Sequence, residues 1–237
     1  MPKVYLAAGH GGGDPGAVGN GLKEKDLNLS ITLACRDVLW WHGVDVKMSS
    51  TTDKEITWQQ EVNECNAYDP DLAVNIHCNA GGGDGAEVFY HYGGGTGKTL
   101  ASNILAEIVA IGQNSRGIKT RRSASGEDYY YFIREIGAPS VIVECAFIDN
   151  EKDIKILDTA AEQKAMGVAI AKGILKTLGI AYKGEADAQE VPVQSAQKPE
   201  SGKLYRCQCG AFRDRSNAEN MVKKLKAAGF DAFIVEV

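Results

Sequence analysis

Short apolar runs alternate with amphipathic helical segments along most of the chain, and this alternation constrains the fold more than any other feature. Three of the runs have the composition of strands, at Val4–Ala8, Leu72–Ile76 and Ser140–Phe147. The longest segments with helical spacing of apolar residues are Leu22–Trp41 and Thr159–Leu178. Strands that alternate with helices of this length are typical of an α/β domain. We therefore expect a mainly parallel, twisted sheet that is sandwiched by helices.

Five further segments complete the larger of the two predicted domains, which we place at residues 1–180. The pattern predicts strands over Val44–Met48 and Glu87–Tyr92, helices over Thr57–Tyr68 and Lys98–Ile111, and a polar loop over 112–128. Ligands of such sheets bind beyond the carboxyl ends of the strands, so the functional residues are expected there.

The end of the chain has a different composition. Residues 181–202 are rich in Ala, Gln, Glu, Pro and Ser and almost lack large apolar residues, which predicts a flexible linker. Residues 203–237 are too few for a conventional core and follow a strand-helix-strand pattern. We therefore expect a small C-terminal α+β unit.

Charge and composition exclude several classes of partner. The chain carries a net charge of −5, and residues 203–237 hold seven basic and four acidic residues, so residues 1–202 carry 19 − 27 = −8. An acidic body of this kind disfavours nucleic acid as a partner. No apolar run is long enough to span a bilayer, so we expect no membrane insertion. The N-terminal residues MPKVYLAAGH lack the features of a secretory signal peptide, and the six scattered cysteines are expected to be buried free thiols.

Two histidines and a carboxylate are predicted to meet at one edge of the sheet. His10 follows the first strand in a glycine-rich loop, which can fold tightly beside whatever His10 holds, and His77 ends the strand Leu72–Ile76. Glu24 and Asp26 both lie at the start of the next helix, and their spacing does not choose between them. Two histidines and a glutamate form a standard catalytic zinc set that leaves a fourth position for water. Zinc acidifies such a water and polarises a carbonyl, which makes amide hydrolysis accessible.

Glu144 is the second unusual feature, because it lies inside the apolar run VIVECAF. A glutamate buried without a partner is costly, so it requires a cation, a hydrogen-bond donor or a catalytic task. One interpretation is a buried ion pair, for which Arg134 is the candidate. The other is a general base that later protonates a leaving amine.

Other polar residues have simpler explanations. Asp14 is explained by the turn Asp14-Pro15-Gly16, and His91 is a spare ligand candidate on a predicted strand. Cys78 and Cys145 each follow a candidate site residue on a strand, so they should point to the opposite face of the sheet and pack as small apolar residues.

Three ordered blocks, HGGGDPGAVGNGLKEKDLNL, NIHCNA and APSVIVECAFIDN, strongly resemble the signatures of zinc-dependent N-acetylmuramoyl-L-alanine amidases of the amidase-3 type. The resemblance covers roughly residues 3–179. It implies that His10, Glu24 and His77 hold one zinc ion per catalytic domain and that Glu144 is the catalytic base. The implied reaction is hydrolysis of the amide between the lactyl group of N-acetylmuramic acid and L-alanine in peptidoglycan.

The chain also departs from that family's pattern. The Thr-Arg pair common after the second strand corresponds to SerSerThrThr at 49–52, and the helix arginine corresponds to Glu61. The departure affects packing or substrate contacts and leaves the zinc set intact. Asn79 and Arg134 are candidate substrate-binding residues of this domain.

The tail LYRCQCGAFRDRSNAENMVKKLKAAGFDAFIV resembles the first half of a sporulation-related repeat, or SPOR domain, a type of domain that binds peptidoglycan glycan strands. Gln208 is its candidate binding residue, flanked by Cys207 and Cys209 where valines are usual. A strand-helix-strand unit leaves an open sheet edge, so we expect two tails to pair in a homodimer.

The expected function is therefore that of a peptidoglycan hydrolase, made in the cytoplasm without a signal peptide and acting on the cell wall after release. A phage or prophage endolysin is the leading interpretation of its role. A mother-cell or other autolysin of a spore-forming bacterium is the alternative. A zinc peptidase that cuts within the stem peptide and an inactive wall-binding protein are further alternatives from other classes.

Overall fold

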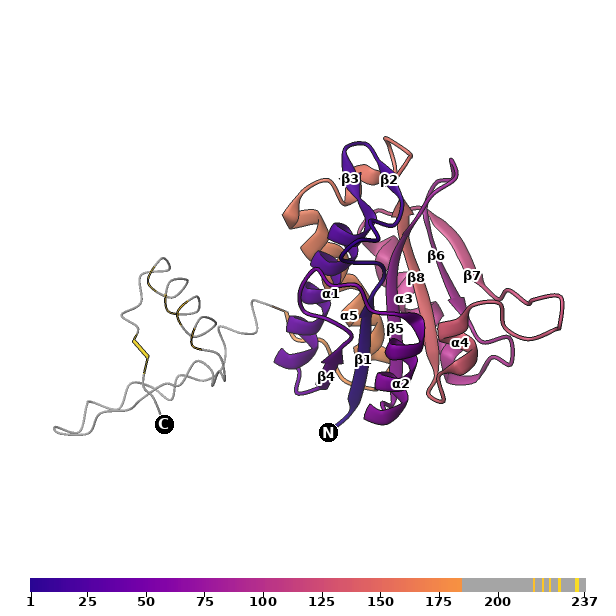
Figure 1. Cartoon of the computed structure of the whole chain (residues 1–237), viewed down its shortest axis with the longest axis horizontal. Coiled ribbons are helices and arrows are strands. Elements are labelled where there is room, and N and C mark those ends of the chain that lie inside the picture. Colours follow the sequence, from indigo (N-terminus) through magenta and orange to yellow (C-terminus); the bar gives the residue numbers. More distant parts are fainter. Residues whose placement is uncertain (185–214, 216–218, 220–221, 223–225, 227–232, 235–237) are drawn as a thin grey trace. The chain divides into compact units, whose positions relative to one another are not determined.

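The computed structural model of the chain describes residues 1–184 and six positions of the tail, residues 215, 219, 222, 226, 233 and 234 (Figure 1). The predicted linker from residue 185 onward, Gln208 and most of the predicted C-terminal unit lie outside the described residues.

A six-stranded sheet forms the centre of the described domain, with the strand order β4-β1-β5-β8-β6-β7. The strands are β1 (Lys3–Ala8), β4 (Asp45–Met48), β5 (Leu72–Asn79), β6 (Ala86–Tyr90), β7 (Ser115–Lys119) and β8 (Ser140–Phe147). All neighbouring strands are parallel except β6 and β8, which pair antiparallel. The predicted mainly parallel α/β sheet is thus confirmed.

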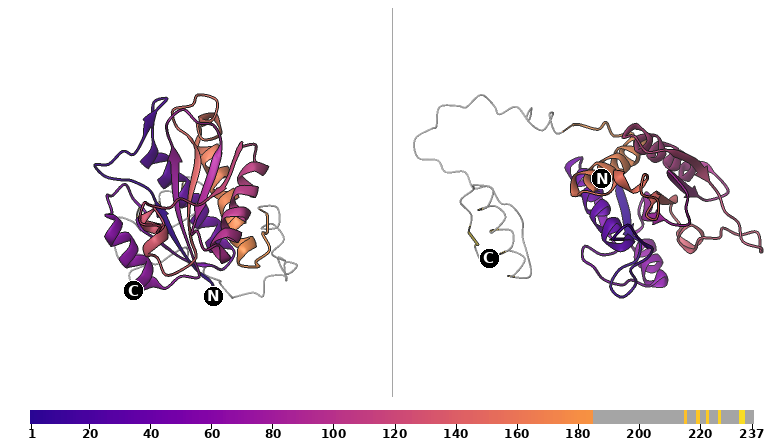
Figure 2. Two further views of the ribbon diagram at one scale, coloured as in Figure 1. Left: turned by 90° about the vertical axis from the view of Figure 1, so that its right-hand side faces the viewer. Right: turned by 90° about the horizontal axis from the view of Figure 1, so that it is seen from above.

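Helices cover both faces of this sheet (Figures 1 and 2). One face packs on α1 (Glu24–Trp41), α3 (Gly95–Ala110) and α5 (Ala160–Thr177), and the other on α2 (Trp58–Tyr68) and α4 (Tyr131–Glu135). A short 3₁₀ helix, Ile154–Ile156, follows β8.

The sequence of β1 is apolar throughout because both faces of this strand are buried. Val4 and Leu6 belong to the core under α1, α3 and α5, whereas Tyr5 and Ala7 belong to the core under α2 and α4. Successive side chains of a strand point to opposite faces, so a strand that is covered on both faces needs an unbroken apolar run.

Two differences between the predicted elements and the structure bear most on the sheet and the site. The prediction of a polar loop over 112–128 was wrong for Ser115–Lys119, which form β7. This strand lies at the sheet edge and is polar and partly exposed, so it lacks the apolar run that marks a central strand. The helix predicted over Leu22–Trp41 begins at Glu24, because Val18–Gly19 (β2) and Leu22–Lys23 (β3) form a short hairpin around Asn20-Gly21. Both turn residues have positive φ, as this dipeptide favours.

None of the helices in the described part of the chain has both the length and the apolar character that a bilayer span requires.

Candidate metal centre

The loop after β1 places His10 at the carboxyl edge of the sheet. The amide of Gly9 still donates to the carbonyl of Ile76 at 3.0 Å, and the chain then turns at His10, whose φ is +67°. Gly11 and Asp14 close the turn with two reciprocal backbone hydrogen bonds of 3.0 Å. A left-handed conformation is uncommon outside glycine and is often retained where function requires it.

His10, Glu24 and His77 form a three-residue cluster in which the potential ligand atoms all lie within 4.8 Å of one another. The Glu24 carboxylate lies between the two imidazoles: Oε2 is 3.2 Å from His10 Nε2, and Oε1 is 3.0 Å from His77 Nδ1. Asp26, the alternative to Glu24, is exposed on the same helix and is not part of the cluster. Two imidazole nitrogens and a carboxylate oxygen from three separate elements fit the donor set of a catalytic zinc site.

The ligand side chains are held by further hydrogen bonds. Asp14 Oδ2 lies 2.7 Å from His10 Nδ1, and Asp14 Oδ1 accepts from the Gly16 amide at 3.0 Å. The Glu24 carboxylate accepts from the amides of Ala17 at 2.9 Å and of Cys78 at 3.1 Å. Such outer partners orient ligands and set the histidine tautomer. The assignment of Asp14 to turn formation alone was therefore incomplete, and its spacing of four residues from His10 was the available signal.

The electrostatics of the cluster suit a cation. The hydrogen bond to Glu24 raises the pKa of His10 to about 9. Burial acts to raise the pKa of Glu24, but the hydrogen bonds from His10 and His77 outweigh it and hold this pKa well below its usual range. Burial acts to lower the pKa of His77, and the hydrogen bond to Glu24 overcomes this and raises it. The carboxylate is thus ionised and stabilises positive charge at both rings.

Two glycines allow the loop to close on the ligands. A methyl group at Gly9 would lie 2.1 Å from Cε1 of His77, which is far inside van der Waals contact. A methyl group at Gly16, whose φ is +64°, would lie 2.6 Å from both the Glu24 carboxylate and the His10 ring. The tight fold expected of this loop therefore has a specific purpose: backbone and ligand side chains occupy the space that a Cβ would need.

Gly9→Ala is expected to displace the His77 ring and weaken metal affinity by about 10- to 100-fold or more, because orienting changes near a metal site have effects of that size. Gly13→Ala is the matched control in the same loop, since its new methyl group would meet only a glutamate oxygen at 3.5 Å. Metal titration of both variants, with circular dichroism to verify folding, checks this. Equal affinity in the two variants would contradict the steric argument.

Glu144 lies beside the cluster in the sheet. On β8 it pairs in register with His77 of β5 on one side and with Glu87 of β6 on the other, so the three side chains share one face. Its Oε2 atom is buried and has no hydrogen-bond partner among the described residues. Burial raises the pKa of Glu144 to about 7. A carboxyl group with such a pKa can both accept and release a proton near neutrality.

The alternative partner for Glu144 is engaged elsewhere. Arg134, on α4, donates to Glu135 at 2.8 Å and to the carbonyl of Asp128 at 2.9 Å. No ion pair joins Arg134 to Glu144 in the described part of the chain. The interpretation of Glu144 as the partner of Arg134 in a buried ion pair therefore has no support among these residues.

The remaining candidate residues from the sequence make contacts outside the cluster of His10, Glu24 and His77. Asn79 ends β5 and donates to Glu87 at 3.0 Å, close to the row that contains Glu144. His91 pairs with Asp128 at 3.1 Å and lies outside the metal cluster. Cys78 and Cys145 are buried free thiols in the core under α1, α3 and α5, the face opposite to the site, as predicted.

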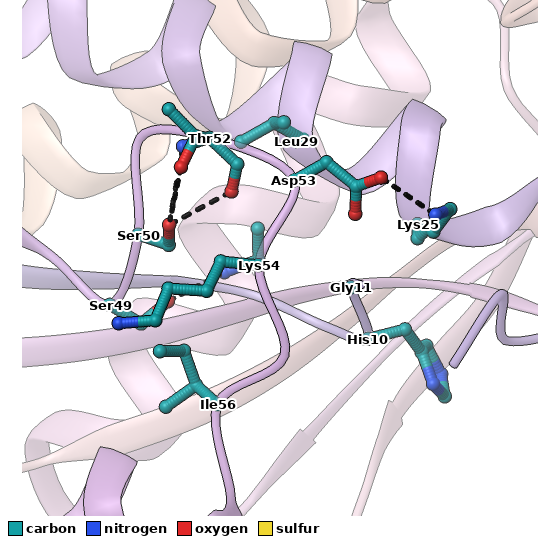
Figure 3. A pocket seen from close by; sticks show the side chains of 11 residues that line it. His10, Gly11, Lys25, Leu29, Ser49, Ser50, Thr52, Asp53, Lys54 and Ile56 are labelled. Carbon is teal, nitrogen blue, oxygen red and sulfur yellow. Dashed lines mark hydrogen bonds and ion pairs between the residues drawn. The ribbon is translucent and has the colours of Figure 1, made fainter. Parts of the chain in front are cut away.

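A small pocket adjoins His10 and is lined in part by residues of the stretch at 49–52 (Figure 3). Ser49, Ser50 and Thr52 line it, and the ion pair of Lys25 with Asp53, at 2.7 Å, bounds it. Glu61, the other departure from the amidase pattern, is buried on α2, where burial raises its pKa to about 7. Its carboxylate accepts from Asn75 at 3.2 Å.

Comparison with known families gives two matches. The sequence model of the family described as N-acetylmuramoyl-L-alanine amidase, Amidase_3, matches residues 4–176. A second model, described as SPOR domain, matches residues 175–236. This match begins upstream of the half repeat expected at 203–237, and the half repeat stays a prediction.

Individual proteins agree with these matches. The sporulation-specific N-acetylmuramoyl-L-alanine amidase of Bacillus subtilis is 32% identical over 99% of this chain and 85% of its own length. An endolysin of Bacillus phage SPP1 is 30% identical over 84% of this chain and 73% of its own length. The solved structure of the N-acetylmuramoyl-L-alanine amidase AmiC2 of Nostoc punctiforme has a TM-score of 0.69 and 30% identity, over 75% of this chain and 97% of that one.

Proposed function

Because the chain belongs to the Amidase_3 family of N-acetylmuramoyl-L-alanine amidases and also carries a SPOR domain, we propose that it hydrolyses the amide bond between N-acetylmuramic acid and L-alanine in peptidoglycan. The observation that carries the proposal is the cluster of His10, Glu24 and His77 with Glu144 beside it in register. The SPOR domain supports binding of the same polymer.

The metal in this proposal is zinc. His10 Nε2, a Glu24 oxygen and His77 Nδ1 would hold it, and their convergence fits a three-ligand site. When bound, zinc polarises the scissile carbonyl and increases the acidity of the attacking water. Asp14 keeps the His10 ring oriented with Nε2 toward the site.

Glu144 carries the proton transfers. Its carboxylate accepts a proton from the water whose oxygen attacks the lactyl carbonyl carbon. As the carbon–nitrogen bond breaks, Glu144 returns that proton to the departing nitrogen, which leaves as the amine of L-alanine. The second hydrogen of the water stays on the new carboxyl group of the lactyl moiety and then passes to the released amine, so the products are a carboxylate and an ammonium group and both atoms and charges balance.

Digestion of purified sacculi tests the proposal. We expect new amino termini on L-alanine and no new reducing ends. Addition of a chelator should prevent the formation of the new amino termini. New amino termini on other residues would instead indicate a peptidase acting within the stem peptide. An absence of any release would indicate a wall-binding protein without catalytic activity.

We further propose that the enzyme acts as an autolysin of a spore-forming bacterium. This role replaces that of a phage or prophage endolysin, which is the leading interpretation of the sequence alone. The sporulation-specific relative aligns with 99% of the chain, including the tail, whereas the phage endolysin aligns with 84%. Transcript measurement tests the role: induction during sporulation supports it, and induction only with phage lytic genes supports the endolysin.

A further inference from the structure

Beyond Glu144, the same face of the sheet carries a charged group that the reaction has not used. Glu87 on β6 is buried, and its Oε2 accepts from Arg116 Nε at 2.7 Å and from Lys119 Nζ. Its Oε1 accepts from Asn79 Nδ2 at 3.0 Å. We call these four residues the Glu87 cluster. Two cations share one carboxylate, so the cluster keeps an excess of positive charge in a domain that is acidic as a whole.

The two cations remain accessible although their anchor is not. The Arg116 and Lys119 side chains are each 36% exposed, whereas that of Glu87 is 7% exposed. The Arg116 guanidinium also lies 4.8 Å from the centre of the Phe147 ring, which fixes its position further. The cluster is therefore a pre-organised pair of donors with free hydrogen-bonding capacity toward solvent.

The register places this cluster next to the reaction centre. Glu87 pairs directly with Glu144, and Glu144 pairs directly with His77, so the row runs from the metal ligands across β8 to β6. The strand β7, which carries Arg116 and Lys119, is the next strand beyond β6. Neighbouring strands are about 4.8 Å apart, so β7 lies roughly 10 Å from β8.

We propose that Arg116 and Lys119 bind the free α-carboxylate of the D-isoglutamate that follows L-alanine in the stem peptide. This inference rests on the proposed amidase function. An extended peptide advances about 3.5 Å per residue, so a carboxylate on the next residue lies about 7 Å from the scissile amide. That distance falls between one and two strand spacings, and the Arg116 and Lys119 side chains reach from β7 toward β8 far enough to contact Glu87 on β6. Arginine and lysine donors are the groups that recognise a carboxylate.

Two soluble muramyl peptides provide the test, identical except that the isoglutamate carboxylate is free in one and amidated in the other. We expect wild-type enzyme to prefer the free acid by about 10- to 100-fold in kcat/KM, the range for hydrogen bonds to charged groups. Lys119→Gln should reduce this ratio toward unity, and Lys119→Arg should retain most of it. Lys98→Gln, on the exposed side of α3 over the opposite face, is the matched control and should keep the wild-type ratio.

The outcomes separate the two proposals. Equal use of both substrates by wild-type enzyme, or a preference that survives both Lys119→Gln and Arg116→Gln, overturns the subsite. If the small substrates are not cleaved, L-alanyl-D-isoglutamate and L-alanyl-D-isoglutamine are compared as inhibitors of sacculus digestion, where stronger inhibition by the free acid supports the subsite and equal inhibition overturns it. Failure to cleave sacculi at all overturns the proposed function itself. Circular dichroism and metal content verify that each variant is folded.

Discussion

Glu144→Gln is expected to reduce kcat on sacculi by about 10²- to 10⁴-fold, the usual contribution of a general acid-base residue, while metal content stays at the wild-type value. The glutamine keeps the size and position of the side chain beside His77 but can neither accept nor return the proton. Release of L-alanine amino termini, measured together with metal content on the same preparation, checks both parts of the expectation.

Glu151→Gln is the control for this variant, because Glu151 is exposed on the loop that follows β8. It should retain wild-type turnover. A fully active Glu144→Gln enzyme would refute the assigned base, and a variant that loses both activity and metal would show that Glu144 acts through the metal ligands.

The pH profile gives an independent readout of the same residue. The base must be ionised, so activity should fall as pH decreases through the pKa of Glu144. Burial raises this pKa to about 7, and a cation at the neighbouring ligands would lower it, so the acidic limb is expected at or below pH 7.

His77→Ala is expected to weaken metal affinity by more than about 100-fold and to abolish measurable hydrolysis, because loss of a ligand should exceed the 10- to 100-fold effect of changing an outer partner. Wild-type enzyme that has been stripped with a chelator should likewise be inactive and should recover on addition of zinc. Adding zinc should not restore the variant at concentrations that saturate the wild-type enzyme.

His91→Ala is the control for the ligand assignment. His91 is half-exposed and pairs with Asp128, so its loss should leave metal content unchanged. Metal loss in His91→Ala together with retention in His77→Ala would show that the wrong histidine had been assigned.

Much of the site was predictable because its residues occupy recognisable local positions. His10 and His77 follow apolar strands, Glu24 begins a helix, and Glu144 interrupts an apolar run. Parallel strands bring their carboxyl ends to one edge, so strand order did not need to be known for these residues to be grouped. The choice of Glu24 over Asp26 came from family resemblance, and the structure agrees by burying Glu24 between the imidazoles while Asp26 is exposed.

Other features could not be deduced from local patterns. The strand β7 has polar, partly exposed residues, because an edge strand buries fewer of its side chains in the core. The spacing of Asp14 four residues from His10 only suggests its second role, because the contact depends on the backbone turn at His10, whose left-handed conformation is a property of the folded loop.

The sequence by itself determined the alternation of strands and helices, the ligand types, and the apolar strand that carries Glu144, because each depends on residues that are near one another in the chain. Only the tertiary structure decided that Glu144 lies between His77 and Glu87, and that Arg116 and Lys119 meet on Glu87. The physical reason is register: contacts between strands depend on how segments tens of residues apart align, and no local periodicity encodes that alignment.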